Sequence, residues 1–334
     1  MRIFVRINPV VCALLLIGVT FPIDSAVKKR GSEVSQTGPA ILWSVPGDIA
    51  SRDLFYGPGG PRSQPHGPYM FVKEDLDGSN PKFVVRDSDG MKWKVKLGVE
   101  ARPETVATRL VWAVGYYANE DYFLQNLQVE NMPARLHRGQ KLVAPDGSMH
   151  NVRLKREDDK KIGGWQWRED PFSGTREWNG LRVMMAVLNN WDLKDENNSV
   201  YQDGTEKVYM VSDLGASFGT DNLTWPLSKA KGNLQSYSHS KFIRHVTPTT
   251  VDFYVPARPE FLYLVHPRDY FSRLPMRWIG RNIPRADARW IGDLLARLSS
   301  RQIQDAFRAA GYSPHEVEAF AQIVETRIAR LTEL

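Results

Sequence analysis

Apolar and polar residues alternate with a period of two between residues 69 and 97, which is the pattern of half-buried strands. It predicts strands at 69–73, 82–86 and 91–97, with turns at 77–82 and 87–90 between them. In the third strand Trp93, Val95 and Leu97 share one face, and three lysines share the other. We expect a three-stranded antiparallel meander, followed by further strands between 120 and 156, at 141–143 and 150–154.

A helical period replaces this alternation in other stretches. Pro103 opens an apolar stripe that ends at Gly115, and a second helix is expected from Thr175, with Met184 and Met185 in the core. Strand patterns return at 199–201 and 208–211, around a turn at 202–204. The C-terminal part is expected to be helical, with helices at 286–298, at 300–310 and from Ser313 onwards.

These patterns predict an α+β fold divided into two lobes. We expect a β-rich N-lobe at 68–156 and a mainly helical C-lobe at 157–334, with a charged hinge at 155–164 that ends in Gly-Gly. Residues 27–67 are rich in Gly, Pro and Ser and are expected to be a lead-in and loop, including the turn residues 57–61. Residues 215–248 show little periodicity and are expected to form a long functional loop.

The first 26 residues have the layout of a secretory signal peptide. Two arginines precede an apolar run at 10–21, and small residues at 25–26 precede a basic triplet. We expect an exported protein, periplasmic or extracellular, that is either cleaved after this segment or anchored to the membrane by it. Cys12 is the only cysteine and lies inside the run, which excludes thiolate catalysis and cysteine zinc sites from the rest of the chain.

Composition adds little more. The chain of 334 residues has a formal net charge of +6, which suits anionic partners. The sequence contains no arginine-rich tract or nucleic-acid recognition motif. Nucleic acid is therefore not the expected partner. His239 and His245 lack the carboxylate spacing of a metal site and are expected to be exposed.

The candidate chemistry lies in two short stretches. One polar loop contains Asp192, Lys194 and Asn197. Asp213 follows after a predicted hairpin, just before Leu214-Gly215. Asp and Asn also cap turns, so ordinary turn chemistry is an alternative explanation.

A second candidate group lies in the N-terminal half. Lys96 ends a predicted strand and Glu104 stands in the first turn of the helix that follows, so the two can pair. Lys96 can equally belong to a solvated lysine face, and Glu104 can simply favour the helix dipole. In the turn before these strands, Gly78, Ser79 and Lys82 offer groups that can contact phosphate oxygens.

The segment Asp-Leu-Lys-Asp-Glu-Asn at 192–197 resembles the protein-kinase catalytic loop, and Asp-Leu-Gly at 213–215 resembles the metal-binding Asp-Phe-Gly motif. The order of strand lysine, helix glutamate, catalytic loop and metal aspartate is also that of kinases. The sequence Gly78-Ser79-Asn80-Pro81-Lys82 is similar to the first turn of HipA-type and related atypical kinases, and the arginine–leucine pair at 109–110 matches their helix. Asn190-Trp191 replaces the usual His-Arg, and no Gly-x-Gly-x-x-Gly loop is present.

The resemblance, which covers residues 69–220, implies a two-lobed, protein-kinase-like fold and roles for the candidate residues. Asp192 would act as the base and Lys194 as a partner for transition-state charge. Asn197 and Asp213 would hold Mg²⁺, while Lys96, oriented by Glu104, would bind phosphate of ATP together with the Gly78, Ser79 and Lys82 turn.

Two classes of function follow. One is an exported phosphotransferase that moves phosphate from ATP to a hydroxyl of a protein or small molecule. The other is a catalytically silent kinase-fold protein at the cell envelope that binds a nucleotide, an anionic lipid or a glycan. An anionic partner would meet the basic residues of the 215–248 segment, which are Lys229, Lys231, Lys241 and Arg244.

Overall fold

The computed structural model describes residues 38–334 except 79, 158–159, 223–227, 256–270 and 272. The described residues belong to one compact unit, Gln36–Leu334. The predicted signal segment, 1–26, lies outside them, as do Cys12 and Ser79. No helix among the described residues combines the length and the apolar character needed to cross a membrane.

The predicted meander is present and is part of a closed five-stranded barrel. Strands β2, β3 and β4 pair antiparallel in sequence order, as expected, and β6 and β5 continue the sheet until β5 pairs in parallel with β2. The strands are β2 (Tyr69–Asp75), β3 (Lys82–Arg86), β4 (Lys92–Lys96), β5 (Asp121–Glu130) and β6 (Ser148–Arg156).

The alternation in β4 determines how the barrel packs. Trp93, Val95 and Leu97 are buried in the barrel's own hydrophobic core with Phe83 and Leu154. The turn before β4 is fixed by Asp87, whose carboxylate accepts hydrogen bonds from the Met91 N–H at 2.8 Å and the Trp93 indole at 2.6 Å. The lysines of β4 therefore face away from this core.

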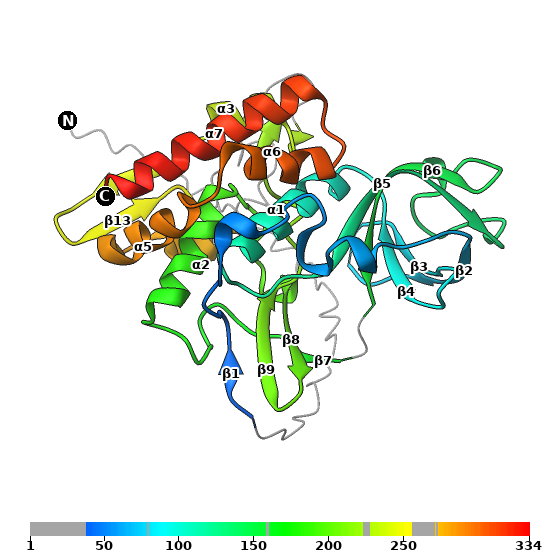
Figure 1. The fold of residues 1–334 in the computed structure, drawn as a ribbon, viewed down its shortest axis with the longest axis horizontal. Helices are drawn as coiled ribbons and strands as arrows, with labels where there is room; N and C mark the ends of the chain where they lie inside the picture. Colours follow the sequence, from blue (N-terminus) through cyan, green and yellow to red (C-terminus); the bar gives the residue numbers. More distant parts are fainter. Residues whose placement is uncertain (1–37, 79, 158–159, 223–227, 256–270, 272) are drawn as a thin grey trace, which may run out of the picture. The chain divides into compact units, whose positions relative to one another are not determined.

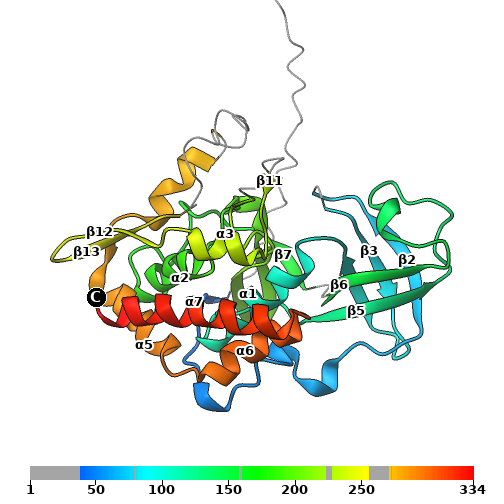
Figure 2. The same ribbon diagram turned by 90° about the horizontal axis from the view of Figure 1, so that it is seen from above.

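Helix α1 (Ala101–Ala113) starts two residues before the predicted Pro103. A proline in the first turn costs no hydrogen bond, because its N–H would have no helical partner there. The apolar stripe of α1, including Val106 and Leu110, lies in the larger hydrophobic core with the C-terminal helices. Figures 1 and 2 show α1 between the barrel strands and helix α6.

A second sheet has the strand order β1-β9-β8-β7. Its members are β1 (Ala40–Ile41), β7 (Lys161–Gly163), β8 (Asn198–Asp203) and β9 (Glu206–Val211). The β8–β9 hairpin was predicted. The expectation of loop throughout 27–67 was wrong at β1, which pairs in parallel with β9 (Figure 1) and is too short to show a period of its own.

The helical part follows the predicted order. Helix α2 (Arg176–Val187) begins after Thr175, whose hydroxyl accepts a hydrogen bond from the Trp178 N–H, and both Met184 and Met185 are buried. Helices α5 (Arg285–Leu295), α6 (Ser300–Ala309) and α7 (Pro314–Thr332) follow, and a capping box of Ser313 and Glu316 begins α7.

Three expectations about secondary structure were wrong. The predicted strand at 141–143 is a 3₁₀ turn (Gln140–Leu142) that leads out of the left-handed Gly139. The predicted loop 215–248 contains β10 (Asp221–Asn222), β11 (Ser228–Lys229), α3 (Leu234–His239) and β12 (Ile243–Val246). The part after it is not wholly helical, since β12 pairs with β13 (Thr250–Phe253) and β13 with β14 (Ile283–Pro284). These elements are short, and their pairing partners are supplied by distant segments.

Candidate functional site

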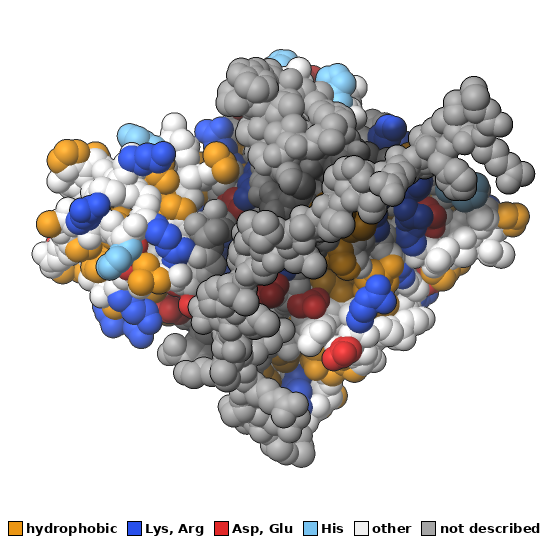
Figure 3. All heavy atoms as spheres, turned by 180° about the vertical axis from the view of Figure 1, so that it is seen from behind, with side chains coloured by type: hydrophobic (Ala, Val, Ile, Leu, Met, Phe, Trp, Pro, Cys, Tyr) orange, Lys and Arg blue, Asp and Glu red, His pale blue; other side chains and the backbone are white. Residues whose placement is uncertain are grey.

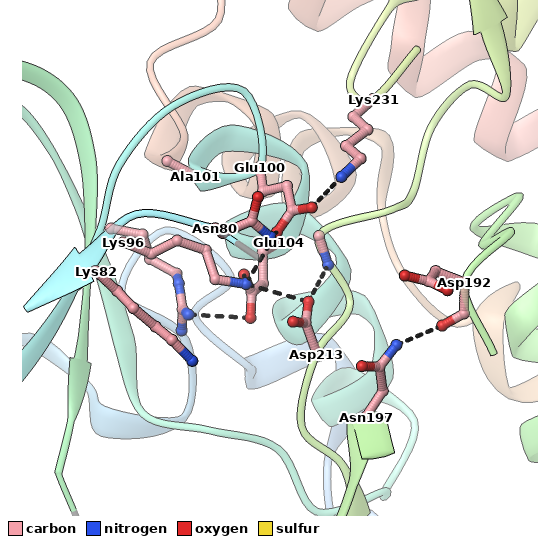
Figure 4. A network of polar contacts seen from close by, with 12 residues as sticks. Asn80, Lys82, Lys96, Glu100, Ala101, Glu104, Asp192, Asn197, Asp213 and Lys231 are labelled. Carbon is pink, nitrogen blue, oxygen red and sulfur yellow. Dashed lines mark hydrogen bonds and ion pairs between the residues drawn. The ribbon is translucent and has the colours of Figure 1, made fainter. Parts of the chain in front are cut away.

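Lys96 lies at the centre of a buried network of charges. Its ammonium is 2.7 Å from Glu104 Oε2, 3.1 Å from Glu100 Oε2 and 3.1 Å from Asp213 Oδ1 (Figure 4). Lys96 and Asp213 are 117 positions apart in the sequence, so the fold brings them together. The alternative of a solvated lysine face does not hold for Lys96, which is 5% exposed.

Local geometry explains how α1 presents two carboxylates to one lysine. Lys96 ends β4, and Gly98, with φ of +86°, reverses the chain into α1. Glu100 is the residue before the helix and Glu104 lies one turn later, so both carboxylates are on the same side of its N-terminus. That end of a helix favours negative charge.

Burial and opposite charges compete within this network. Burial alone would lower the pKa of Lys96, but the charges of Glu104, Asp213 and Glu100 outweigh it and raise the pKa. For Asp213, burial acts to raise the pKa, and the nearby Lys96 ammonium and the Gly215 N–H outweigh it and hold the pKa well below its usual range. The lysine and the aspartate are therefore charged at neutral pH.

Arg153 is a second buried cation that sequence reasoning missed. Its guanidinium is 3.1 Å from Glu104 Oε1 and 3.6 Å from Asp121 Oδ2. Burial raises the pKa of Glu104, while the charges of Arg153 and Lys96 oppose that rise. Arg153 stands opposite Lys96 in the β4–β6 register, and this pairing of distant strands leaves no local pattern in the sequence.

Sequence reasoning also missed Glu100 as a member of this network, and it placed Lys231 among the residues that would meet an anionic partner. The ammonium of Lys231 forms an ion pair with Glu100 Oε1, and the Asn80 amide donates to Glu100 Oε2 (Figure 4). Burial acts to raise the pKa of Glu100, but the charges of Lys96 and Lys231 lower it overall. Lys231 is thus part of this network, although the sequence suggested a role in contacting an anionic partner.

The β8–β9 hairpin places Asn197 beside Asp213. The two residues flank the hairpin, and the Asn197 carbonyl accepts hydrogen bonds from the Ser212 N–H at 2.8 Å and the Asp213 N–H at 3.2 Å. The side-chain amide of Asn197 donates to the Asp192 carbonyl at 2.6 Å. That bond uses the nitrogen and leaves the amide oxygen, the atom that a metal ion would need.

Asp192 lies close by, on a segment held by Trp191. The Trp191 N–H donates to the Ala216 carbonyl at 3.1 Å, which ties the 190–197 loop to the 213–218 segment, and Trp191 itself is buried. The Asp192 carboxylate is 3.1 Å from the Arg273 guanidinium and 3.6 Å from the Lys194 ammonium. Arg273 had no sequence signal, because the segment around it resembles no motif.

The predicted phosphate-contact turn is only partly described. Lys82 is directly opposite Lys96 in the β3–β4 register (Figure 4). Its ammonium forms a 3.7 Å ion pair with Asp75. The carbonyl of Gly78 accepts a hydrogen bond from Arg138. Ser79 lies outside the described residues.

The basic residues expected to meet an anionic partner include Lys229, whose side chain lies outside the described part, and the other three do not form one group. Lys241 and Arg244 are exposed and lie over the Tyr254 ring, at 5.4 and 5.6 Å from its centroid, while Lys231 is in the charge network. His239 and His245 are exposed, as predicted.

The donor set fits a magnesium ion at Asp213 and Asn197. Mg²⁺ prefers carboxylate and carbonyl oxygens, and the Asp213 side chain is 38% exposed, whereas that of Glu104 is 1% exposed. Glu100, Glu104 and Asp213 also offer oxygens within 4.8 Å of one another, but Lys96 lies among these three and would have to move. Figure 3 shows acidic side chains beside basic ones near the middle of one face, so both signs of charge are accessible there.

Comparison with known proteins gives few matches. No protein-family model matches this sequence, and no curated protein sequence matches it. Among solved structures, it is similar to a proinflammatory kinase, CtkA, of Helicobacter pylori, at 11% identity and a TM-score of 0.45. The match covers 79% of this chain and 95% of that one, and it is too weak to assign a fold or an activity.

Proposed function

We propose that this chain is a kinase-like phosphotransferase with a two-lobed fold, which transfers phosphate from ATP to a hydroxyl in a magnesium-dependent reaction. The observation that carries this proposal is the buried contact of Lys96 with both Glu104 and Asp213. A lysine fixed by one carboxylate and placed against a second, more accessible one suits binding of a phosphate beside its metal ion. Turn chemistry alone gives no reason to join these three residues across two distant segments.

Each residue has a role in this proposal. Lys96, held by Glu104 and Glu100, binds phosphate oxygens, and Lys82 stands on the same side of the sheet. Asp213 and Asn197 hold Mg²⁺, which supplies charge neutralisation for the phosphates when bound. Asp192 accepts the proton of the acceptor hydroxyl, and Lys194 stabilises the charge that develops in transfer.

The proposed acceptor is a hydroxyl of a protein or a small molecule. The proposed setting is the cell envelope, reached by means of the 1–26 segment, with the apolar run 10–21 as the anchor if that segment is retained. Lys241 and Arg244, both exposed, are the residues that would contact an anionic partner there.

Nucleotide binding tests the proposal directly. Thermal shift with ATP should raise Tm only when Mg²⁺ is present, and Asp213→Ala should lose the magnesium-dependent part. Transfer of labelled phosphate to a hydroxyl acceptor is then measured for the same two proteins. Asp203→Ala is a suitable control, because its carboxylate is exposed and paired only loosely with Lys160, at 3.8 Å. If ATP with Mg²⁺ fails to stabilise the unmodified protein, the proposal is wrong.

A second candidate is a catalytically silent binding protein of the same fold, and the Arg273 contact favours it. A guanidinium 3.1 Å from Asp192 occupies the side chain that would receive the proton. This candidate predicts magnesium-dependent ATP binding without transfer, or binding of an anionic lipid or glycan in place of ATP. Arg273→Met separates the two, because phosphate transfer that appears or rises in this variant would show that Asp192 is a competent base.

A further inference from the structure

A pocket of about 550 Å³ opens next to the charge network, on the far side of the turn that leads into α1. Its walls come from Gly98 and Val99, the 3₁₀ turn at 140–142, strand β6 and the α6–α7 connection. The volume is within the range of sites that take small organic ligands. Among its lining residues are Arg102, Lys141, Leu142, His150, Lys231 and Tyr312.

The charged groups in the pocket wall are all basic. Arg102, Lys141 and Lys231 carry positive charge, and none of the described residues that line the pocket is acidic. Lys141 is exposed and forms no ion pair with a described residue. The buried Nε of Arg102 has no hydrogen-bond partner within the part of the chain that the structure describes.

Aromatic and aliphatic groups complete the wall. Arg102 lies over the Tyr312 ring, 5.3 Å from its centroid, and Leu142 and Val99 are 41% and 73% exposed. A ligand with a compact apolar part can contact these side chains while its charged end meets the cations. Lys231 is already paired with Glu100, but Arg102 and Lys141 form no ion pair with a described residue, and two such cations favour a dianion over a monoanion because a second negative charge gains from the same field.

We propose that this pocket binds a small phosphate monoester with an apolar body, at a site separate from the Lys96–Asp213 centre. Arg102 and Lys141 contact the phosphate through charge-assisted hydrogen bonds. The apolar body packs against Leu142 and Tyr312. This assignment stands on the pocket alone and does not depend on the chain being a kinase.

Lys231 connects the two sites. Lys231 is one of the lining residues of the pocket, and its ammonium pairs with Glu100, which in turn contacts Lys96. A phosphate in the pocket competes with Glu100 for Lys231. Occupation of the pocket therefore strengthens the ion pair of Glu100 with Lys96. In this way ligand binding in the pocket changes the Lys96–Asp213 centre.

Calorimetric titration of the protein with phenyl phosphate, and with phenol as the neutral analogue, tests the proposal. Phenyl phosphate is expected to bind, and phenol to bind at least about 10-fold more weakly. Lys141→Ala is expected to lower the affinity for phenyl phosphate by about 10-fold, which is the effect of losing one charge-assisted contact. Lys73→Ala, which removes one exposed lysine on β2, is the matched control and should leave affinity unchanged.

Two further results decide whether phenyl phosphate binds in this pocket or at the Lys96–Asp213 centre. Lys82→Ala alters the Lys96–Asp213 centre and should not change phenyl phosphate binding, whereas an effect as large as that of Lys141→Ala would place the ligand there and overturn the proposal. No heat of binding, or equal affinity for phenol, would also overturn it. Neither result bears on ATP binding, so failure of this proposal and failure of the kinase proposal are distinguishable.

Discussion

At the scale of single residues, Glu104 is a buried carboxylate shared between two buried cations. It is 1% exposed and contacts two cations, Lys96 at 2.7 Å and Arg153 at 3.1 Å. Desolvating three charged groups is costly, and only their mutual contacts offset that cost. The stability of the network therefore depends on every member being present.

Glu104→Gln should destabilise the protein strongly, since it leaves Lys96 and Arg153 buried with one counter-charge fewer. Loss of one partner in a buried ion pair typically costs about 3–5 kcal/mol. Urea unfolding measures the change in the free energy of unfolding. The matched control is Glu120→Gln, whose partner Arg156 is 41% exposed and for which a loss below about 1 kcal/mol is expected. Equal losses in both variants would show that the buried network is not special.

Lys155 supplies a prediction about pH. Burial, with the nearby Arg153 charge, lowers the pKa of Lys155 to about 7, below its ordinary value of 10.5. Between these values the unfolded chain binds the proton that the folded chain lacks, so this lysine makes stability rise with pH from about 7 to about 10.5 and costs stability below that window. Lys155→Met should therefore raise Tm at pH 6, and its advantage should shrink by pH 9. A Tm difference that stays constant from pH 6 to 9 would contradict this origin.

At the scale of elements, the site depends on close contact between the 213–215 segment and the start of α1. A Cβ added at Gly215 would come within 2.8 Å of Glu100 Cβ and 2.9 Å of Glu100 Oε2. Distances below 3 Å require one of the two segments to move. The glycine after Leu214 is thus needed here for space, since its φ is not in the left-handed region.

Gly215→Ala should lower the free energy of unfolding by about 1–3 kcal/mol, the usual cost of overpacking. It should also weaken any magnesium-dependent nucleotide binding, because Asp213 and Glu100 are pushed apart. Gly163→Ala in β7 is the control, since a Cβ there meets nothing within 4 Å. Thermal unfolding with and without ATP and Mg²⁺ reports both effects. A Gly215→Ala protein as stable as the Gly163→Ala protein would refute the steric argument.

The elements also show what could be predicted. Strand β3 was predicted with its observed bounds, because Lys82–Arg86 has a strong apolar run between clear turns. Lys96 and Glu104 could be linked from sequence, since a strand, a glycine and a helix start separate them by only eight positions. Asp213 and Asn197 could be linked through the hairpin. Arg153, Glu100 and Lys231 could not be added, because their contacts depend on strand pairing and loop paths that no local pattern records.

At the scale of the whole molecule, helix α1 joins two hydrophobic cores. Its apolar face belongs to the larger core, and its polar side holds the barrel through Arg109, whose guanidinium is 2.9 Å from Asp121 Oδ1 on β5. Both side chains are fully buried. Burial lowers the pKa of Arg109, and the charge of Asp121 opposes that shift. Because α1 also carries Glu100 and Glu104, any change in its position moves the carboxylates that hold Lys96.

This pair predicts that the barrel and the helices unfold together. Amide hydrogen exchange measured through a urea series should give one coincident transition for β3 and β4 and for α6 and α7, since the strands report on the barrel core and the helices on the larger core. Arg109→Met should cost about 3–5 kcal/mol, because Arg153, at 3.6 Å, is then the one cation among the described residues that still pairs with Asp121. The double variant Arg109→Met, Asp121→Leu should recover much of that loss, since no uncompensated charge is left in the interior. If the double variant is as unstable as the sum of its single variants, the pair holds α1 by specific geometry rather than by balanced charge. Two separate transitions in the unmodified protein would show instead that the two cores are independent.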